Sequence, residues 1–244
     1  MIEKFHFHRF EFKYLVDKRI KGAMLRDLLR HMDYDIPYEL DSDFYEVLNL
    51  YLDSHNLKFY REKMDGLMFR RKMRFRFYTA NPSEHEHVYI EIKRKRNMTI
   101  IKDRVKLPYG DAFNIANRSF SGFLEKMDSF GQQEKDVLSE FLFEIMKNRL
   151  SSRLWVNYKR TALAAKDFPK LRITFDDDII TSKARNGFGF DLRRGSRRIF
   201  RNKSIFEVKY NGTLPYWVHG LIQKYGLFRE PISKYCNAIE NLVI

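Results

Sequence analysis

Basic residues at every second position of one short segment are the first chemical signal in this sequence. Within residues 69–78, Lys72, Arg74 and Arg76 alternate with apolar residues, and a period of two places the three cations on one face of a β-strand. Same-face neighbours on a strand lie about 6.6 Å apart. Two unit charges at that separation repel by about 0.6 kcal/mol in water and by about 2.5 kcal/mol at an effective dielectric of 20. Inside a closed sheet, the row therefore requires carboxylates, a metal or a polyanion.

A Glu-x-Lys pattern, repeated in three predicted strands, is the second signal. Residues two apart on a strand face the same side, so each repeat places a carboxylate and an ammonium on one face. Arginine binds phosphate oxygens bidentately and lysine binds them as a point charge. Carboxylates can hold a hard divalent cation that bridges phosphoryl oxygens. The pattern favours phosphate chemistry, and its members are Glu11–Lys13, Glu91–Lys93 and Glu207–Lys209.

An antiparallel sheet with one ionic face in water is the alternative interpretation of these strands. On that interpretation Lys72, Arg74 and Arg76 are solvated, and Glu207 forms a cross-strand ion pair. The acidic run 176–178 is interpreted as a turn after a strand, with Asp176 at most a partner for an arginine.

The overall charge indicates an anionic partner. The 244 residues include 46 Lys and Arg against 32 Asp and Glu, a formal net charge of +14. Nucleic acid, a lipid surface and a phosphorylated substrate all fit such a charge. Because the aromatic residues mostly occupy the faces opposite the cations, base stacking is disfavoured and no nucleic-acid partner is expected. One cysteine excludes an intrachain disulfide and a cysteine-rich zinc site.

Hydrophobic patterning predicts an α+β fold in one domain over 1–244. No apolar stretch approaches the roughly 18 residues of a membrane span, and the start lacks a signal-peptide core, so we expect a cytoplasmic protein without a transmembrane segment. Helical spacing predicts helices at 17–31, 215–225 and 232–242, and a helical insertion at about 111–148. Alternation predicts strands at 9–15, 45–52, 57–62, 69–78, 88–95, 99–107, 154–162, 171–176 and 205–210.

Seven segments, in this order, resemble the VTC (vacuolar transporter chaperone) polyphosphate polymerase domain of the CYTH or triphosphate tunnel metalloenzyme superfamily. They are RFEFKY (9–14), KMRFR (72–76), YIEIK (89–93), YKRT (158–161), LRITFD (171–176), FEVK (206–209) and SKY (233–235). The resemblance implies a closed antiparallel β-barrel, or tunnel, of about eight strands with helices packed outside. It also implies a metal-dependent polyphosphate polymerase that transfers the terminal phosphate of ATP onto a polyphosphate chain, with Mn²⁺ as the expected metal and Mg²⁺ as the alternative.

The resemblance also assigns roles to residues. Glu207 becomes the leading metal ligand, with Glu91 and Glu11 as further candidates. Tyr158, Lys72, Lys102 and Arg104 become substrate-binding residues. The phosphate ligands at the catalytic centre become Lys13, Arg74, Arg76, Lys93, Arg160, Arg172, Lys209 and Lys234.

One departure from the superfamily pattern bears on the reaction. Hydrolytic tunnel enzymes typically open with Glu-x-Glu-x-Lys, whereas Arg9 occupies the first acidic place here, which favours the polymerase branch. The alternatives are a triphosphatase of the same fold, acting on inorganic or nucleoside triphosphate, and a non-catalytic module that binds polyphosphate or nucleic acid. Any transport of the product would require a separate membrane protein as a partner.

Overall fold

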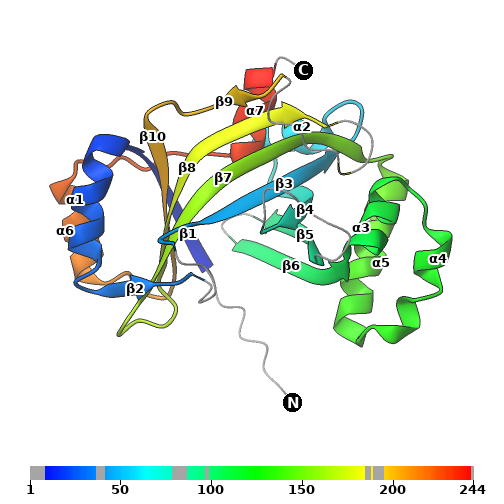
Figure 1. Cartoon of the computed structure of the whole chain (residues 1–244), viewed down its shortest axis with the longest axis horizontal. Helices are drawn as coiled ribbons and strands as arrows, with labels where there is room; N and C mark the ends of the chain where they lie inside the picture. The colour runs from blue at the N-terminus through cyan, green and yellow to red at the C-terminus, as the bar shows by residue number, and fades with distance from the viewer. Residues whose placement is uncertain are drawn as a thin grey trace.

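A strongly curved antiparallel sheet dominates the computed structural model, which describes residues 9–36, 42–78, 87–96, 99–184, 188 and 195–242 (Figure 1). Eight strands follow one another in the order β1-β10-β8-β7-β3-β4-β5-β6, and the short strands β2 and β9 add to β7 and β8. The strands are β1 (Arg9–Asp17), β2 (Met32–Tyr34), β3 (Tyr45–Asp53), β4 (Phe69–Phe77), β5 (His87–Arg96), β6 (Thr99–Pro108), β7 (Ser151–Ala165), β8 (Arg172–Lys183), β9 (Arg197–Arg198) and β10 (Lys203–Asn211).

Seven α-helices and one 3-10 turn flank the sheet within the described residues. In Figure 1, α1 and α6 lie together on one side, α3, α4 and α5 lie on the other, and α7 lies next to α2. They are α1 (Lys18–Leu28), α2 (Lys58–Met64), α3 (Tyr109–Ala116), α4 (Ser121–Leu124), η1 (Met127–Ser129), α5 (Gln132–Lys147), α6 (Tyr216–Lys224) and α7 (Lys234–Leu242). The predicted α+β class is confirmed. None of the described helices combines the length and the apolar character needed to span a lipid bilayer.

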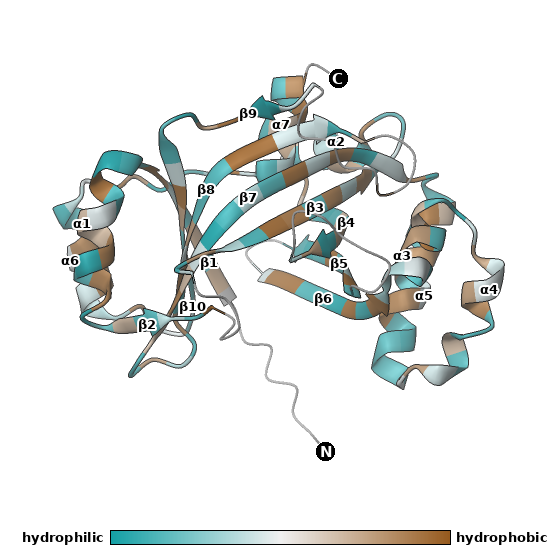
Figure 2. Cartoon of the chain, in the orientation of Figure 1, coloured by the Kyte–Doolittle hydropathy of each residue, from teal (hydrophilic) through white to brown (hydrophobic). Residues whose placement is uncertain are grey.

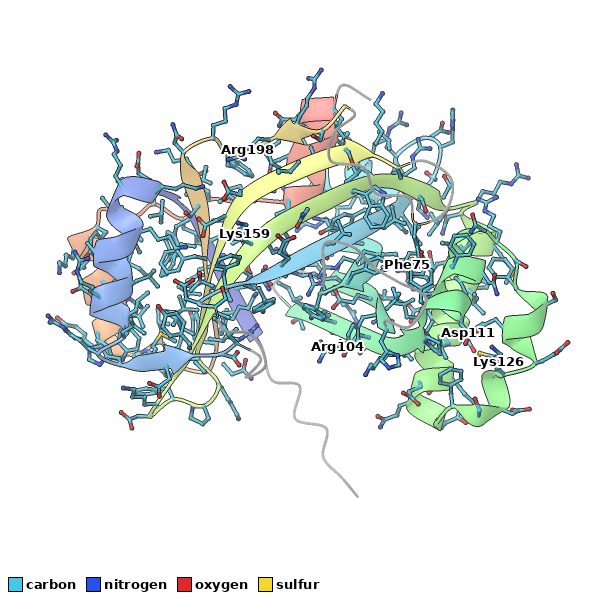
Figure 3. All side chains as sticks on the ribbon, in the orientation of Figure 1. Phe75, Arg104, Asp111, Lys126, Lys159 and Arg198 are labelled. Carbon is cyan, nitrogen blue, oxygen red and sulfur yellow. The ribbon has the colours of Figure 1, made fainter. Side chains whose placement is uncertain are left out.

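Alternation along the strands separates an apolar outer face from an ionic inner face, and bands of opposite hydropathy follow one another along β7 and β8 (Figure 2). On β4, Met73, Phe75 and Phe77 are fully buried on the outer face. The Phe75 ring meets the Phe141 ring of α5 with 5.5 Å between centroids, and Figure 3 shows Phe75 between the sheet and these helices. The helices thus bury the apolar half of each strand and leave the ionic half facing inward.

Helix α1 begins as the sequence predicts, because Asp17 caps it by accepting the Arg19 N–H at 2.9 Å. The predicted strand at 57–62 is wrong, since these residues mostly belong to α2. The buried Asp53 carboxylate accepts the N–H groups of Phe59 and Tyr60 at 2.9 and 3.1 Å, so it satisfies two of the donors that a helix start leaves free.

The acidic run 176–178 does not form the predicted turn, because β8 continues through it to Lys183. Each carboxylate meets a cation instead: Asp177 pairs with Lys21, and Asp178 pairs with Lys18 at 2.8 Å. Asp176 is fully buried on the inner face. Partners from other elements therefore allow three successive acids to remain in a strand.

Hydrogen bonds do not close the sheet in the described part of the chain, in contrast to the expected barrel. The end strands β1 and β6 approach each other without a ladder between them. The free edge of β1 is occupied instead by a returning segment: the Glu230 N–H donates to the Lys13 carbonyl at 2.8 Å, and Arg229 bridges to Tyr14. At Lys13 and Tyr14 the edge that a β1–β6 ladder would use is thus already occupied.

Helix α7 also departs from the expectation that all helices lie outside. Its residues Tyr235, Cys236 and Ile239 pack with inner-face residues of β3 and β7. The Tyr235 ring stacks on Tyr51 with 5.0 Å between centroids. Helix α7 therefore covers part of the inner face and delivers its first residue, Lys234, into the interior.

Candidate active site

Strand register gathers the predicted ionic residues on the inner face. On one side of the interior, Glu11 of β1 lies opposite Lys209 of β10, which lies opposite Arg172 of β8. On the other side, Arg74 of β4 lies opposite Glu91 of β5. All fifteen residues predicted for the site line one cavity of about 600 Å³: Glu11, Lys13, Lys72, Arg74, Arg76, Glu91, Lys93, Lys102, Arg104, Tyr158, Arg160, Arg172, Glu207, Lys209 and Lys234.

Positive charge dominates the lining of this cavity. Eleven lysines and arginines face it against three carboxylates, those of Glu11, Glu91 and Glu207. Burying charge that is only partly neutralised is costly, so an excess of eight basic side chains over carboxylates in the lining of a partly enclosed space favours the entry of a polyanion. Lys72, Arg74 and Arg76 therefore line a cavity and not an open solvated face, whereas Glu207 does form a cross-strand ion pair, with Lys13.

Glu207 stands at the centre of one group of cations. Its carboxylate lies 2.5 Å from the Lys209 ammonium and 3.3 Å from that of Lys234. Lys13 and Arg160 follow at 3.4 and 3.9 Å. Burial alone would raise the pKa of Glu207, but these four cations hold it well below its ordinary value. Glu207 is thus a buried anion, available as a hard oxygen ligand.

Asp176 lies behind this group and neutralises part of it. Arg160 donates to both of its carboxylate oxygens, at 2.6 and 2.8 Å, and Lys234 forms a close ion pair with it. The same two cations lie over the Tyr158 ring, 5.2 Å and 4.9 Å from its centroid. Asp176 and Tyr158 therefore fix the positions of Arg160 and Lys234 within the cavity wall.

Glu91 organises the opposite wall. Arg74 and Lys102 each approach this buried carboxylate to 2.5 Å, and Arg76 approaches it to 3.4 Å. Burial would raise the pKa of Glu91, yet the three cations lower it. Burial, followed by the nearby Arg76, lowers the pKa of Lys102 to about 7. Because Glu91 is shared among three cations, it leaves each of them capable of binding a further anion.

Glu11 and Glu207, two of the three predicted metal ligands, lie close enough together to share one cation. Lys13 lies 2.7 Å from Glu11 and 3.4 Å from Glu207, so one ammonium joins the two carboxylates. Among the described residues no group of three His, Cys, Asp or Glu side chains is positioned to hold a metal. Mg²⁺-type sites are often built from one or two carboxylates, substrate phosphates and water. The pair fits a divalent cation of that kind, whereas Glu91 lies on the other wall.

Lys72 differs from most cations of the cavity. Its ammonium donates to the Ser233 hydroxyl at 2.6 Å, and no carboxylate in the described part of the chain lies within ion-pair distance of it. Burial, with smaller contributions from the cations Lys13 and Lys93, lowers the pKa of Lys72 to about 7. Lys72 is therefore a buried cation that an incoming anion would stabilise.

Several residues of the lining were not predicted. Tyr51 accepts a hydrogen bond from Arg74 at 2.8 Å, and Tyr45 accepts one from Arg172 at 3.3 Å. Both tyrosines share a face of β3 with Asn49, which accepts from Arg76 at 3.0 Å. Polar groups at the same-face positions 45, 49 and 51 could have indicated this lining. The segment is so apolar overall, however, that its sequence is typical of a strand buried on both faces.

A second cavity of about 350 Å³ extends the interior toward the other end of the strands. It shares six lining residues with the first: Glu11, Lys13, Lys72, Lys93, Ile100 and Ser233. Its own cations include Arg70, Lys95 and Arg229. The basic interior therefore continues beyond the cavity around Glu91 and Glu207.

Comparison with solved structures identifies the class of fold. A putative adenylate cyclase from Bacillus halodurans shares 13% identity with this chain, with a TM-score of 0.50 and coverage of 96% of this chain and 98% of that one. A Hippeastrum protein, described as a putative adenylyl cyclase with a dominant triphosphatase activity, shares 14% identity, with a TM-score of 0.47 and 96% coverage of both chains. At 13% identity the likeness to the Bacillus halodurans protein concerns the fold alone.

The family itself follows from a sequence comparison. A model of the VTC domain matches residues 8–243, nearly the whole chain. The protein therefore belongs to the VTC domain family, which confirms the resemblance seen in the seven motifs. A search of curated proteins finds no significant match.

Proposed function

We propose that this protein is a metal-dependent polyphosphate polymerase that transfers the terminal phosphate of ATP onto a polyphosphate chain. The observation that carries the proposal is the excess of eight cations in the cavity, arranged around three carboxylates. Phosphoryl transfer requires mainly positioning and electrostatic stabilisation of charge on the phosphoryl oxygens. The terminal oxygen of polyphosphate is already an anionic nucleophile, so the transfer needs no strong general base.

The residues on the two walls of the cavity have different proposed roles. Arg74 and Arg76 offer guanidinium forks to the transferred phosphoryl group, and Lys209 offers a point charge from the opposite wall. Arg160 is held by Asp176 in a fixed geometry, which lowers the cost of ordering it when substrate binds. A divalent cation, Mn²⁺ with Mg²⁺ as the alternative, would be held by Glu207 and Glu11 and would neutralise charge on the phosphoryl oxygens.

Two features favour a polymer as the substrate. The second cavity continues the basic interior beyond the first, which gives an extended anion space to occupy. Glu11 of β1 forms an ion pair with Lys93 of β5 at 2.8 Å, so side chains bridge the gap that backbone hydrogen bonds leave open. We infer that such ion pairs, together with the bound anion, complete the wall of a closed tunnel.

Triphosphate hydrolysis by the same cavity is the second candidate. The observation that favours it is the presence of three carboxylates in the lining, any of which can orient a water molecule near a bound triphosphate. Arg9, which replaces the first glutamate of the hydrolase pattern, begins β1 opposite Asn211. Its side chain lies outside the described part of the structure.

Incubation of the pure protein with ATP and Mn²⁺ tests both candidates. Long-chain polyphosphate with ADP supports the polymerase, whereas free orthophosphate as the main product supports the triphosphatase. Arg74→Ala should abolish either reaction, and Arg198→Ala is the matched control because Arg198 lies on the exposed strand β9, away from the cavity (Figure 3). If neither product forms with Mn²⁺, Mg²⁺ or other divalent metals, the enzymatic assignment fails.

The expected partners are ATP and polyphosphate, in the cytoplasm where ATP is abundant, with a separate membrane protein for any transport of product. Nucleic acid is not expected to bind, since polyphosphate would occupy the same cations. A gel shift with nucleic acid that persists at physiological salt with excess tripolyphosphate would favour the binding-module alternative.

A further inference from the structure

The turn between α2 and β4 is built rigidly and points its apolar side chains outward. Helix α2 ends in a Schellman motif, in which the Leu67 N–H donates to the Glu62 carbonyl and the Gly66 N–H to the Lys63 carbonyl. Gly66 has a φ of 69°, which suits glycine. The position that usually packs against Leu67 in this motif is Glu62, so Leu67 gains no apolar partner there.

Four large apolar side chains are consequently exposed within six residues. Isolated exposed apolar residues are common on protein surfaces, but a contiguous group at the tip of an ordered turn indicates an interaction site. Schellman hydrogen bonds on one side and the pairing of Phe69 with Arg96 on the other hold the backbone of the turn. The exposed fractions are 53% for Met64, 48% for Leu67, 62% for Met68 and 58% for Phe69.

Cations surround this apolar turn. Arg61 and Lys63 belong to the last turn of α2, and Arg96 of β5 lies over the Phe69 ring, 5.2 Å from its centroid. Arg70 follows directly on β4. The exposed Asp65 is the acidic residue of the turn itself. Apolar tips with a basic margin are complementary to a surface that has an anionic layer over a hydrocarbon layer.

We propose that the turn 64–69 docks the protein onto an anionic lipid surface, with Leu67, Met68 and Phe69 entering the headgroup region. The basic margin favours this occupant over an apolar protein groove, which would leave Arg61, Lys63 and Arg96 facing desolvation without partners. Lys63 and Arg70 also line the second cavity, so docking would bring that end of the interior close to the lipid surface. This inference does not depend on the proposed reaction.

Co-sedimentation with vesicles tests the docking without any measurement of activity. Wild-type protein should bind vesicles of phosphatidylcholine with 30 mol% phosphatidylserine and should bind pure phosphatidylcholine much less. Leu67→Glu should weaken binding by more than about tenfold, because it places an anion among lipid phosphates. Leu124→Glu is the matched control: Leu124 is 54% exposed on α4, at the outer edge of the α3–α5 group in Figure 1, and its variant should bind as wild type does.

Equal binding by Leu67→Glu and wild type, or no binding by wild type, would overturn the proposal. Insertion is tested separately by Met68→Trp with brominated lipids, which quench indole fluorescence only within the bilayer. Of the two native tryptophans, Trp155 is fully buried and Trp217 is half-buried on α6, so the wild-type protein measures the background quenching. Binding without quenching of the introduced indole would show adsorption by charge alone and would also overturn the proposal.

Discussion

Lys72 gives the sharpest test of the electrostatic description of the cavity, because its ammonium is buried against the Ser233 hydroxyl and its pKa is lowered to about 7. At pH 8 a group with a pKa near 7 is only about 10% protonated, so an anion that restores full protonation makes the protein take up about 0.9 proton at this site. We expect tripolyphosphate binding at pH 8 to be accompanied by that uptake, and we expect Lys72→Met to remove it.

Titration calorimetry in several buffers of different ionisation enthalpy measures the number of protons exchanged on binding. Proton exchange by tripolyphosphate itself is common to both proteins, so the difference between wild type and Lys72→Met isolates the lysine. Lys159→Met is the control, since Lys159 lies over the Phe44 ring and does not line the cavity. Equal proton uptake by wild type and Lys72→Met would refute the reasoning.

The same lowered pKa affects folding stability. Between pH 7 and 10.5, the unfolded chain binds more protons at Lys72 than the folded protein does, so this residue makes stability rise with pH through that window. Below pH 7 the cost of keeping it charged is at most about 5 kcal/mol, from 1.36 kcal/mol per pH unit. Lys72→Met should therefore stabilise the ligand-free protein most at low pH, as measured by urea denaturation at pH 6 and pH 10.

Three further predictions concern other parts of the molecule. Arg74→Ala should lower kcat by about 100-fold or more, as for other lost transition-state donors, with an unchanged circular dichroism spectrum because Glu91 keeps two other cations. Glu207→Gln should raise the concentration of Mn²⁺ needed for half-maximal activity, measured by metal titration after treatment with a chelator, because it removes one anionic oxygen ligand. Asp53→Ala should lower the free energy of unfolding by about 2–4 kcal/mol in denaturant titrations, because it leaves the backbone N–H groups at the start of α2 without an acceptor.

Each of these expectations has a contradicting outcome. A normal rate for Arg74→Ala would remove that wall from the reaction. An unchanged metal requirement for Glu207→Gln would assign the metal to other ligands. Wild-type stability of Asp53→Ala would show that α2 forms without this cap.

The strands and their inner faces could be predicted because a period of two is a local property of the sequence. The residues of β4 and β10 alternate so regularly between apolar and ionic that the register of the sheet only had to bring the ionic faces together. The residue types on those faces, in particular the repeated Glu-x-Lys pattern, could also be identified from the sequence. For these reasons all the predicted site residues line the same cavity.

Features that depend on distant partners could not be predicted. Helix α2 requires the Asp53 carboxylate, whose role as a cap is set by tertiary structure. The sequence around Asp176 is typical of an acidic turn. Its partners Lys234 and Arg160 belong to other elements, so only the tertiary structure shows that it is buried in an ion pair. Closure of the sheet depends on the segment around Glu230, which occupies the free edge of β1. No periodicity in the sequence predicts that contact.

The contact between β1 and the segment after α6 has a consequence for biosynthesis. Lys13 and Ile232 meet in the folded protein although 219 positions separate them. At roughly 5–20 residues per second, a ribosome needs on the order of 10–45 s to make that stretch. During this time β1 has emerged without either of its neighbours, and a translation product interrupted before β10 lacks an entire wall of the cavity. Assembly of the complete cavity is thereby deferred until the polypeptide is almost fully made.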